Sequence, residues 1–455
     1  MKRYDEYIEI NSPWIKNIPM NWNAKRLKSV AAYISRGETP VYTDDTSCTK
    51  VINQATFSQG YWNTKKVRYT SSSPIGNESV PKQRDILLAS TGRGVLGKVF
   101  YFDQSDTYIA DGHVTIIRTC KTLNSRFLYY YLSVHFDTIN GLLARGSTNQ
   151  TELQEYSLKN MPVPLPSADE QDQIVRYLDW QVSKINRLIA AKRKRIELVK
   201  EHFSVRIANI VCNGLKPNTP MRETGIDYIG AIPSHWTVLQ NKRLFKSMNR
   251  TFQGIPTVLS LSQKDGLIPY SEMTERSLHT SSYENWQLVC PNDLVLNRFK
   301  AHLGVFFASK YTGIVTFHYG VYEAKMPLVA KYYEVLYHTP EYCRVYAGQS
   351  RGMTVGLQNL SDTNFYSTYT VYPPNEEQRE IVTEIEQIEK QQSSIIAGVN
   401  RQIEKLQEFR TRLISDVVTG QVDVRGIEVP DFEYVGEADV AGEQDEGETE
   451  GEADG

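Results

Sequence analysis

A segment of 44 or 45 residues occurs twice in this chain with the same pattern of side chains. The first copy, residues 170–214, begins EQDQIV, and the second, residues 377–420, begins EQREIV, which fixes an offset of 207 residues. This period is too long for a solenoid, whose repeats span roughly 20–50 residues. It indicates a duplicated module made of a globular domain and a long helix. Two similar modules on one chain suggest a partner with two separated sites.

A second pair of matching segments precedes the globular parts. Residues 14–22 and 228–236 share an aromatic residue followed by Ile-x-x-Ile-Pro-x-x-Trp, at an offset of 214. We expect this proline–tryptophan segment to pack on a neighbouring element. A purely local contact among its own apolar side chains explains the pattern equally well.

The globular parts are rich in short apolar runs of the β type. The first copy contains VRYT, DILLAST, KVFYF and HVTIIR, and the second contains DLVLNRF, LGVFFAS and GIVTF. Gly, Pro, Asn and Asp separate these runs, as expected for short strands in a mixed sheet or partial barrel. A helical stretch, residues 125–139, follows the strands of the first copy. The predicted fold class is α/β (α+β), and because the copies differ in the middle we expect one fold with two different surfaces.

The repeated segments carry an apolar ladder with spacings of four and three residues in alternation. Such a 3.5-residue period favours a coiled coil, and the glycines at 214 and 420 are typical helix stops. At 1.5 Å per residue, about 44 residues give a rod about 65 Å long. The ladder positions are Leu178, Val182, Ile185, Ile189, Ile196, Val199 and Phe203 in the first copy and Ile385, Ile396, Val399, Ile403, Leu406 and Leu413 in the second.

The direction of pairing decides how the two globular parts are arranged. Antiparallel rods would place them at opposite ends, related by an internal pseudo-twofold repeat. Parallel rods would place them side by side.

The net charge of −2 hides an uneven distribution. Residues 431–455 contain 11 of the 53 acidic residues and no basic one, so residues 1–430 carry 51 basic and 42 acidic residues, a net charge of +9. A positive body fits a polyanionic partner. The acidic end has almost no large apolar residue, so we expect it to be disordered. It either keeps the chain soluble or competes with nucleic acid for the basic body.

Composition argues against several classes of protein. The five cysteines are scattered without a C-x-x-C pair, so neither a zinc site nor a disulfide framework is expected. No apolar run reaches about 18 residues, and the first ten residues lack an apolar signal core. We expect a cytoplasmic protein that does not contact a membrane.

Two short motifs resemble sites with chemistry. Residues 92–97 fit G-x-G-x-x-G, but a strand-like run follows where a dinucleotide loop requires a helix, so the glycines should shape a hairpin. Asp293, Glu323 and Lys325 imitate the Asp…Glu-x-Lys set of metal-dependent nucleases, but the first copy has isoleucine and arginine where the last two should match. We therefore predict no catalytic residue and no metal site, with metal-dependent cleavage as a third alternative.

Several stretches resemble the specificity subunit of type I restriction–modification systems. A proline-rich step into an EQ-led helix, occurring twice at an offset of 207 residues, is a specific signal for this family. The resemblance covers most of the chain before its acidic end. The stretches that carry it are IGAIPSHW (229–236), KNMPVPLPSADEQDQIVRYLD (159–179), TVYPPNEEQREIV (370–382), DILLASTGRGVLGKV (85–99) and RGSTNQTEL (145–153).

The resemblance implies two target-recognition domains, each reading one half of a split, asymmetric DNA sequence. It also implies that a long antiparallel two-helix coiled coil separates them. The implied boundaries are 1–165 for the first domain, 166–215 for the first spacer helix, 216–372 for the second domain, 373–425 for the second spacer helix and 426–455 for an acidic disordered tail.

The resemblance further implies that the chemistry belongs to partner subunits. The helices would bind two methyltransferase (modification) subunits, and restriction/translocase subunits would join them in the full complex. S-adenosylmethionine, ATP and Mg²⁺ are expected only on those partners, so this chain should carry no cofactor.

Double-stranded DNA is the expected ligand of both domains. Arg reads guanine and Asn or Gln reads adenine, whereas Lys, Ser and Thr mainly hold phosphates. Two candidate groups come shortly after the matching landmarks Asp85 and Asp293, which is the main reason for selecting them. The candidates are Asn53, Gln54, Lys65, Lys66, Ser90, Thr91, Arg93, Lys98, Arg145, Ser147, Asn149 and Gln150 in the first domain and Asn297, Arg298, Lys300, His302, Arg351 and Gln358 in the second.

These patterns predict a non-enzymatic DNA-recognition subunit of a restriction–modification complex. The alternative is a stand-alone architectural or regulatory DNA-binding protein that dimerises through its rods. Such a protein would bind DNA tightly in the absence of any methyltransferase.

Overall fold

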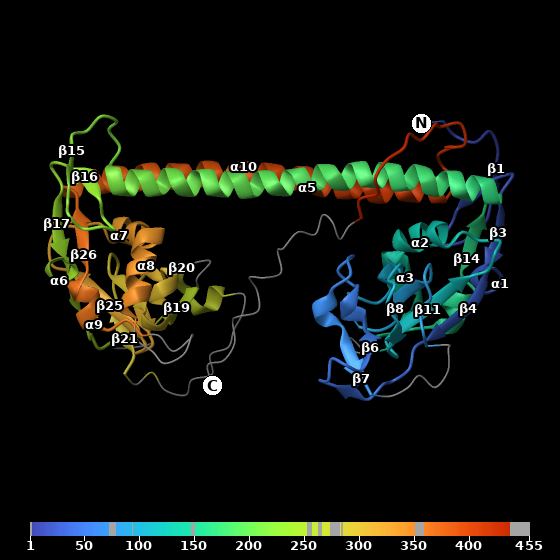
Figure 1. Ribbon diagram of the computed structural model, residues 1–455, viewed down its shortest axis with the longest axis horizontal. Helices are drawn as coiled ribbons and strands as arrows, with labels where there is room; N and C mark the ends of the chain where they lie inside the picture. Colours follow the sequence, from blue (N-terminus) through green and yellow to red (C-terminus); the bar gives the residue numbers. More distant parts are fainter. Residues whose placement is uncertain are drawn as a thin grey trace. The chain divides into compact units, whose positions relative to one another are not determined.

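The computed structural model describes residues 2–71, 79–92, 94–146, 151–252, 257–262, 266–273, 283, 285–350 and 359–436. The chain forms two compact units, Met1–Arg195 with Gly398–Gly455 and Ile196–Ala397. Each unit combines antiparallel strands, short helices and one half of each of two long helices (Figure 1). The predicted fold class, α/β (α+β) with two domains, is confirmed, while the residue boundaries of the domains stay predictions.

The first unit contains many short strands and four short helices in its described part. Its helices are α1 (Leu27–Val30), α2 (Ser125–Ser133), α3 (Phe136–Leu143) and α4 (Glu155–Lys159), with 3-10 helices η1 (Gln54–Thr56) and η2 (Thr64–Lys66). Its strands are β1 (Tyr7–Glu9), β2 (Asn17–Pro19), β3 (Asn23–Arg26), β4 (Ala31–Arg36), β5 (Tyr42–Thr43), β6 (Thr49–Ile52), β7 (Arg68–Thr70), β8 (Ile86–Ala89), β9 (Val99–Tyr101), β10 (Tyr108–Ala110), β11 (Val114–Thr119), β12 (Ala144–Arg145), β13 (Glu152–Leu153) and β14 (Pro162–Leu165).

The second unit repeats much of this order. Its short helices are α6 (Asn241–Leu244), α7 (Ala330–Tyr337), α8 (Pro340–Gln349) and α9 (Asp362–Ser367), with 3-10 helices η3 (Tyr270–Glu272) and η4 (Arg298–Leu303). Its strands are β15 (Met221–Glu223), β16 (Ala231–Pro233), β17 (Thr237–Gln240), β18 (Phe245–Ser247), β19 (Leu259–Ser262), β20 (Gly266–Pro269), β21 (Gln287–Val289), β22 (Leu294–Asn297), β23 (Phe306–Ala308), β24 (Gly313–Val315), β25 (Tyr319–Ala324) and β26 (Tyr369–Tyr372).

The same four-stranded antiparallel sheet forms the centre of each unit. The strand order is β4-β11-β8-β9 in the first and β18-β25-β22-β23 in the second. Ile117 pairs with Ile86 in the first sheet and Tyr322 pairs with Leu294 in the second. Because Ile86 and Leu294 directly follow Asp85 and Asp293, both sheets have the same register relative to the two aspartates. All four residues of β8 are buried, which explains why its sequence is continuously apolar and does not alternate.

The strands beside this sheet differ between the units. In the first unit a second sheet has the order β10-β6-β7-β5, with β6 parallel to β10. In the second unit a parallel bridge between Val258 and Ile314 lies at the equivalent place, next to the two-stranded sheets β19-β20 and β21-β24. The divergent middle of each sequence copy therefore lies in and around this second layer of strands.

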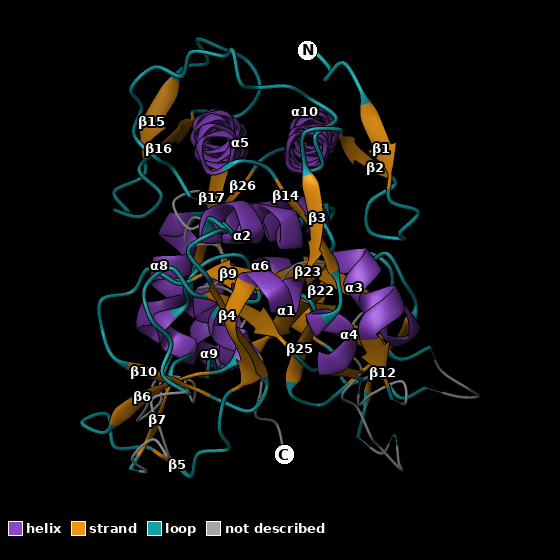
Figure 2. Ribbon diagram, turned by 90° about the vertical axis from the view of Figure 1, so that its right-hand side faces the viewer, coloured by secondary structure: helices purple, strands orange, loops and turns teal. Residues whose placement is uncertain are grey.

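The helical stretch predicted at residues 125–139 is broken in the structure. It forms α2 and α3, with Val134 and His135 between them. Figure 2 shows α2 beneath the long helices. Arg126 and Tyr130 of α2 both donate hydrogen bonds to Asp179 of the first long helix, at 2.7 and 2.5 Å. The stretch predicted to be helical is therefore helical in the structure, with a break at Val134 and His135.

The two long helices are α5 (Ala168–Asn213) and α10 (Asn375–Val418). In the first unit Arg410 donates a hydrogen bond to Asn186, and Lys192 donates one to Gln402. Residue numbers that increase along α5 are therefore paired with residue numbers that decrease along α10. In the second unit Arg206 pairs with Glu384 at 2.8 Å. The antiparallel pair is thus confirmed within each unit.

The predicted ladder residues lie between the paired helices or towards the short helices beneath them. Leu178, Val182, Ile185, Ile189, Phe203, Ile385, Val399, Ile403 and Leu413 are buried, whereas Ile196, Val199, Ile396 and Leu406 are only half-buried. Polar residues occupy other inward positions, as the hydrogen bonds of Asn186 and Lys192 show. Polar contacts of this kind fix the register of a coiled coil at some cost in stability.

Each long helix ends against a proline–tryptophan segment. Gly214 and Gly420 follow the two helices with φ angles of 80° and 73°, a left-handed conformation that favours glycine. A Cβ atom at Gly420 would collide with Pro19, and one at Gly214 would lie 3.0 Å from Oε1 of Glu377 and 3.4 Å from the Trp236 ring. The expectation that this segment packs on a neighbouring element is confirmed.

The chain after α10 does not become disordered where the sequence predicted. The side chain of Gln173 donates hydrogen bonds to the carbonyl oxygens of Val424 and Ile427, at 2.9 and 2.7 Å. Asn186 donates to the Val435 carbonyl at 2.9 Å. Residues 421–436 therefore form a strap along α5 in the first unit, and the predicted start of disorder at residue 426 is wrong for 426–436. The more acidic remainder lies outside the described residues.

Candidate nucleic-acid interface

Asp85 and Asp293, the two landmarks, have the same structural role. Each carboxylate accepts a hydrogen bond from the backbone N–H three residues earlier, from Lys82 at 2.7 Å and from Cys290 at 2.8 Å. Each carboxylate also pairs with an arginine, which is Arg118 of β11 in the first unit and Arg250, in the loop after β18, in the second. These aspartates fix the turn that starts the central strand, so the residues after them are presented at the same place in both units.

Both units also place a histidine at one strand position that the sequence did not single out. His113 directly precedes β11 and His318 directly precedes β25, and the shared register makes the two positions equivalent. Both side chains are exposed. No sequence signal identified them, because the number of residues between aspartate and histidine differs between the copies. Only the pairing of the strands reveals the equivalence.

A polar cluster surrounds His113 in the first unit. The Thr91 hydroxyl lies 2.9 Å from Nδ1 of His113 and donates a hydrogen bond to Oε1 of Gln54 at 3.3 Å. The backbone N–H of Gly92 donates to the carbonyl of Thr151 at 3.1 Å. The fold therefore joins four segments that are distant in sequence, and it places two predicted residues, Gln54 and Thr91, beside one that was missed.

Charged side chains border this cluster. Glu152 forms a β-bridge with Thr91 and lies opposite Arg145 in the β12–β13 pair. Arg36 lies 3.7 Å from the Glu152 carboxylate and donates a hydrogen bond to the Leu153 carbonyl at 3.0 Å. Arg145 is exposed. Guanidinium, hydroxyl, amide and imidazole groups in one place are the donors and acceptors that read base edges in a DNA groove.

Two candidates of the first unit have structural roles instead. Ser90 is fully buried, and its hydroxyl lies 2.5 Å from that of Thr115. The Asn53 side chain caps η1 by accepting from the Ala55 N–H at 2.9 Å, and its amide donates to the Lys66 carbonyl at 2.8 Å. Ser90 is therefore excluded as a DNA contact, and Asn53 shapes the loop that presents Gln54.

The candidate lysines of the first unit differ in accessibility. Lys65 and Lys66 lie exposed on η2. Lys98, at the start of β9, is half-buried with its ammonium 5.4 Å from the centre of the Phe136 ring. The predicted glycine hairpin is confirmed, since Gly97 and Ala89 bond across the β8–β9 connection.

The candidates of the second unit lie at the start of η4. Asn297 caps this helix by accepting from the N–H groups of Phe299 and Lys300, at 3.1 and 3.3 Å. Arg298 forms an ion pair with Asp362 at 2.8 Å. Lys300 is exposed, whereas Nδ1 of His302 is buried without a hydrogen-bond partner among the described residues. Of these four, Lys300 is the most accessible to a ligand.

Six predicted candidates lie outside the described residues, so their contacts stay predictions. They are Arg93, Ser147, Asn149, Gln150, Arg351 and Gln358.

The residues whose sequence pattern resembles a nuclease site form an ion-pair network in the structure. Arg250 pairs with Asp293 at 2.5 Å and with Glu323 at 3.1 Å. Lys246 also lies 3.5 Å from Glu323, and Lys325 donates to the Lys242 carbonyl at 2.7 Å. Burial raises the pKa of Asp293 above its usual value, although the hydrogen bond from Arg250 opposes the rise. Within the described residues no group of His, Cys, Asp and Glu side chains is arranged to hold a metal ion.

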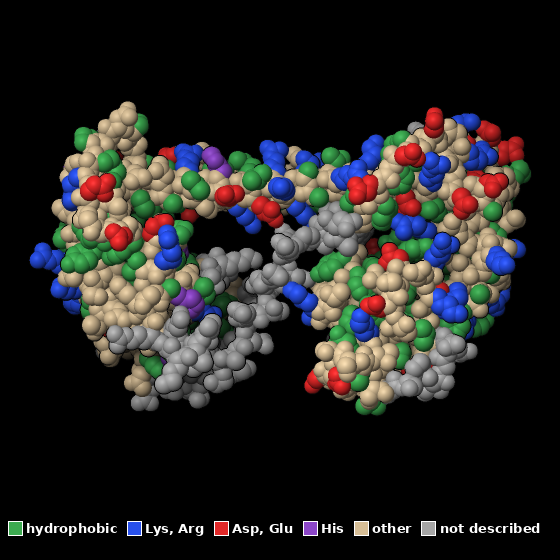
Figure 3. Space-filling model, viewed as in Figure 1, with side chains coloured by type: hydrophobic (Ala, Val, Ile, Leu, Met, Phe, Trp, Pro, Cys, Tyr) green, Lys and Arg blue, Asp and Glu red, His purple; other side chains and the backbone are tan. Residues whose placement is uncertain are grey.

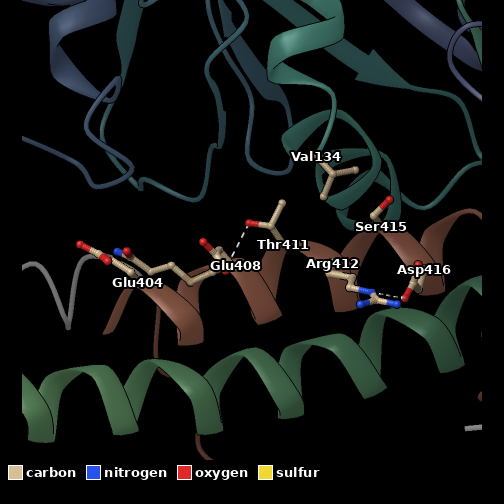
Figure 4. Close-up of a pocket in the computed structure, with 8 residues that line it drawn as sticks. Val134, Glu404, Glu408, Thr411, Arg412, Ser415 and Asp416 are labelled. Atoms are coloured by element: carbon tan, nitrogen blue, oxygen red, sulfur yellow. Dashed lines mark hydrogen bonds and ion pairs between the residues drawn. The ribbon is translucent and has the colours of Figure 1, made fainter. Parts of the chain in front are cut away.

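A broad groove lies on α10 in the first unit. It has a volume of about 630 Å³ and is lined by Val134, at the end of α2, and by one face of α10 (Figure 4). Glu404, Glu408 and an Arg412–Asp416 pair lie along this face. The groove is wide open and lies along one face of a single helix, whereas a small-molecule site usually encloses most of its ligand.

The visible surface gives no single basic stripe. Lys and Arg side chains are spread over both units and interspersed with Asp and Glu (Figure 3). The candidate interface thus rests on the strand-end clusters and not on bulk charge.

In the part of the chain that the structure describes, no helix is both long and apolar enough to cross a lipid bilayer.

The duplicated sheet with different strand-end clusters, together with the long paired helices, defines a class of protein built from two repeated units. Residues 19–198 match the family described as the type I restriction modification DNA specificity domain. The resemblance expected from the sequence is confirmed: the chain is similar to the type I specificity subunits.

Two curated relatives are similar to this chain. The MjaX type I restriction enzyme specificity subunit of Methanocaldococcus jannaschii is 24% identical over 275 residues, which are 56% of this chain and 63% of the relative. The type I restriction enzyme specificity subunit S.HindORF215P of Haemophilus influenzae is 28% identical over 94 residues, 21% of this chain and 23% of the relative. The chain thus matches less than two thirds of the length of either relative.

One solved structure has a similar fold. It concerns the complex assembly and conformational transition of the type I R-M system, and one of its chains aligns with a TM-score of 0.61 at 14% identity. The alignment covers 89% of this chain and 99% of that chain. At this identity the likeness shows a shared fold.

Proposed function

We propose that this chain is the DNA-reading subunit of a type I restriction–modification complex and that each unit reads one half of a split, asymmetric target. One observation carries the proposal. Both units present the same central sheet in the same register, yet the residues at the end of its strands differ in chemistry. A common frame with two different sets of side chains suits two independent readers of two different half-sites.

In the first unit we assign direct reading to Gln54, Thr91, His113 and Arg145. Their amide, hydroxyl, imidazole and guanidinium groups match the donors and acceptors of base edges. Lys65, Lys66 and Lys98 would hold phosphates, which position the protein without selecting a sequence. The connected hydrogen bonds of Thr91 keep the reading groups in one arrangement before DNA binds.

We further propose that the chain is not an enzyme and that its partners supply the chemistry. Two methyltransferase subunits would dock on the paired helices, and restriction/translocase subunits would join them in the cytoplasm. S-adenosylmethionine, ATP and Mg²⁺ would bind only to those partners. The support is that the nuclease-like carboxylates Asp293 and Glu323 already pair with Arg250, and Glu323 also with Lys246.

The decisive experiment is a domain exchange followed by mapping of methylated sites. The chain is expressed with its methyltransferase partner, and residues 1–160 are replaced by those of another specificity subunit. We expect one half of the methylated sequence to change and the other half to persist. A change in both halves contradicts one domain per half-site.

The alternative of a stand-alone architectural DNA-binding protein has its own outcome. It is favoured if the purified chain alone binds duplex DNA tightly and coexpression with methyltransferase produces no methylated motif. The nuclease alternative is tested by incubating the complex with DNA and Mg²⁺ after Asp293→Asn. Loss of cleavage in this variant, with DNA binding retained, would contradict a structural role for Asp293.

A further inference from the structure

An exposed aromatic cluster lies in the second unit at the turn before β25 and on η4. Phe317 is 58% exposed and Phe299 is 36% exposed. The ring of His318 is near both, with its centre 4.0 Å from that of Phe317 and 5.9 Å from that of Phe299. Leu303, also on η4, is 48% exposed. Grouped apolar side chains in water usually mark a surface that a partner covers.

The position of this cluster in the second unit matches that of the polar cluster in the first unit. His318 occupies the strand position that His113 occupies in the first unit. Likewise, η4 comes after β22 as the loop with Thr91 comes after β8. The aromatic cluster of the second unit therefore corresponds to the hydrogen-bonding cluster of the first.

The charges around the cluster suit a polyanion. Residues 298–303 and 316–318 contain Arg298, Lys300, His302 and His318 and no acidic residue, and Arg298 is paired with Asp362. Lys300 and His318 are exposed beside the phenylalanine rings. Apolar rings for bases next to cationic groups for phosphates form the usual composition of a nucleic-acid contact.

We propose that Phe317, supported by His318 and Phe299, makes an apolar contact with a base in the half-site read by the second unit. This inference rests on the proposed function of the chain as a DNA reader. The ring contacts either the methyl group of thymine, which distinguishes thymine from cytosine in the major groove, or a base step that opens to admit it. The second unit thus reads by shape and apolar contact where the first unit reads by hydrogen bonds.

Selection from a library of randomised duplexes tests this assignment. The complete chain with its methyltransferase partner is compared with Phe317→Ala and Phe317→Leu. We expect Phe317→Ala to lose base preference in one half of the selected motif and to bind the wild-type sequence about tenfold more weakly. Phe317→Leu should retain part of the preference. The thermal midpoint should not change, because the side chain is more than half exposed.

A matched control and two modified duplexes complete the test. Tyr369→Ala removes another exposed aromatic side chain of the same unit and should leave both halves of the motif intact. Uracil in place of thymine should weaken the wild type and not Phe317→Ala if the ring contacts the methyl group. An increase in the fluorescence of 2-aminopurine placed in the duplex, seen with the wild type and not with Phe317→Ala, would instead show that the ring inserts into a base step. This result also supports a contact between Phe317 and a base.

Other outcomes overturn the inference. If Phe317→Ala selects the same motif as the wild type, the ring does not contact a base. If the motif is unchanged but the variant no longer binds a protein subunit of the complex, the cluster is a protein contact. If the wild type selects no split motif at all, the proposed function fails and this inference fails with it.

Discussion

Oε1 of Gln171 accepts a hydrogen bond from the backbone N–H of Asn124 at 2.7 Å, and this contact ties the start of α5 to the start of α2. Oε1 of Gln378 accepts from the N–H of Val329 at 2.9 Å, which ties the start of α10 to the start of α7. Each amide also donates to a proline carbonyl five residues earlier, at 3.0 and 2.9 Å. The glutamine of the repeated EQ motif is therefore a structural link between long helix and globular part.

The glutamate of the motif has a matching role with different partners. Glu377 accepts from Nε1 of Trp236 at 3.0 Å and contacts His235 at 2.8 Å. Glu170 accepts from the Tyr4 hydroxyl at 2.6 Å and from the Asn21 amide at 3.3 Å. Both glutamates thus connect the first turn of a long helix to the proline–tryptophan segment on which the other long helix ends.

Replacement of Gln378 by alanine should destabilise the second unit. The change removes two hydrogen bonds and leaves the Val329 N–H and the Pro373 carbonyl without their partner in a buried place. We expect the free energy of unfolding to fall by about 2–4 kcal/mol, measured by urea denaturation. Gln387→Ala, on an exposed face of the same helix, is the control. Equal effects of the two changes would contradict a structural role for the motif.

His135 should make the first unit sensitive to acid. Its ring is 8% exposed, and its centre lies 4.6 Å from that of Tyr131 and 5.6 Å from that of Trp14. Burial lowers its pKa from 6.5 to about 4. Because the folded state disfavours the proton, the stabilisation is full above pH 6.5 and is lost as the pH falls towards 4.

The His135→Phe variant isolates this effect. Phenylalanine keeps an aromatic ring but cannot titrate. Between pH 7.5 and 5.0 we expect the wild type to lose about 2 kcal/mol more unfolding free energy than the variant. Parallel pH profiles of the two proteins would show that His135 does not titrate in the buried state described.

His113→Ala and Thr91→Val should alter only one half of the target. Each change removes a group that we assign to base reading in the first unit, so affinity for the cognate duplex should fall by about tenfold. Mapping of methylated DNA should show relaxed preference in the half-site of the first unit. Ser90→Ala, at the buried neighbouring position, should leave the motif unchanged, and a motif altered in the other half would refute the assignment.

Truncation should separate the strap from the acidic end. A chain that ends at Arg425 loses the carbonyl acceptors for Asn186, Arg187 and Arg176 on α5. We expect its thermal midpoint to fall by about 5 °C or more. A chain that ends at Gly436 keeps these contacts and should melt as the full chain does. If both truncations melt alike, the strap contributes nothing to stability.

Much of the framework could be predicted because its signals are local. The apolar strands, the heptad ladder and the terminal glycines are explained by the period and conformation of neighbouring residues. The EQ motif was recognised as a signature, but its physical role could not be, because its partners Asn124 and Val329 are 47 and 49 residues away.

The candidate sites were predicted less well, for the same reason. Gln54 and Thr91 were selected by residue type and proximity to a landmark, and the fold does bring them together. Ser90 passed the same criteria, yet it points into the core, since only strand pairing decides which residues after a strand face the solvent. Phe317 was missed because an apolar side chain in a β-type run suggests burial.

The sequence by itself determined a duplicated module, two long helices and two copies of one mixed fold, because repetition and periodicity are written in the order of residues. Tertiary structure alone decided that His113 and His318 are equivalent, that Asp293 is neutralised by Arg250 and that residues 421–436 lie along α5. Each of these depends on contacts between residues far apart in the chain, and such contacts form only when strands pair in register and helices pack.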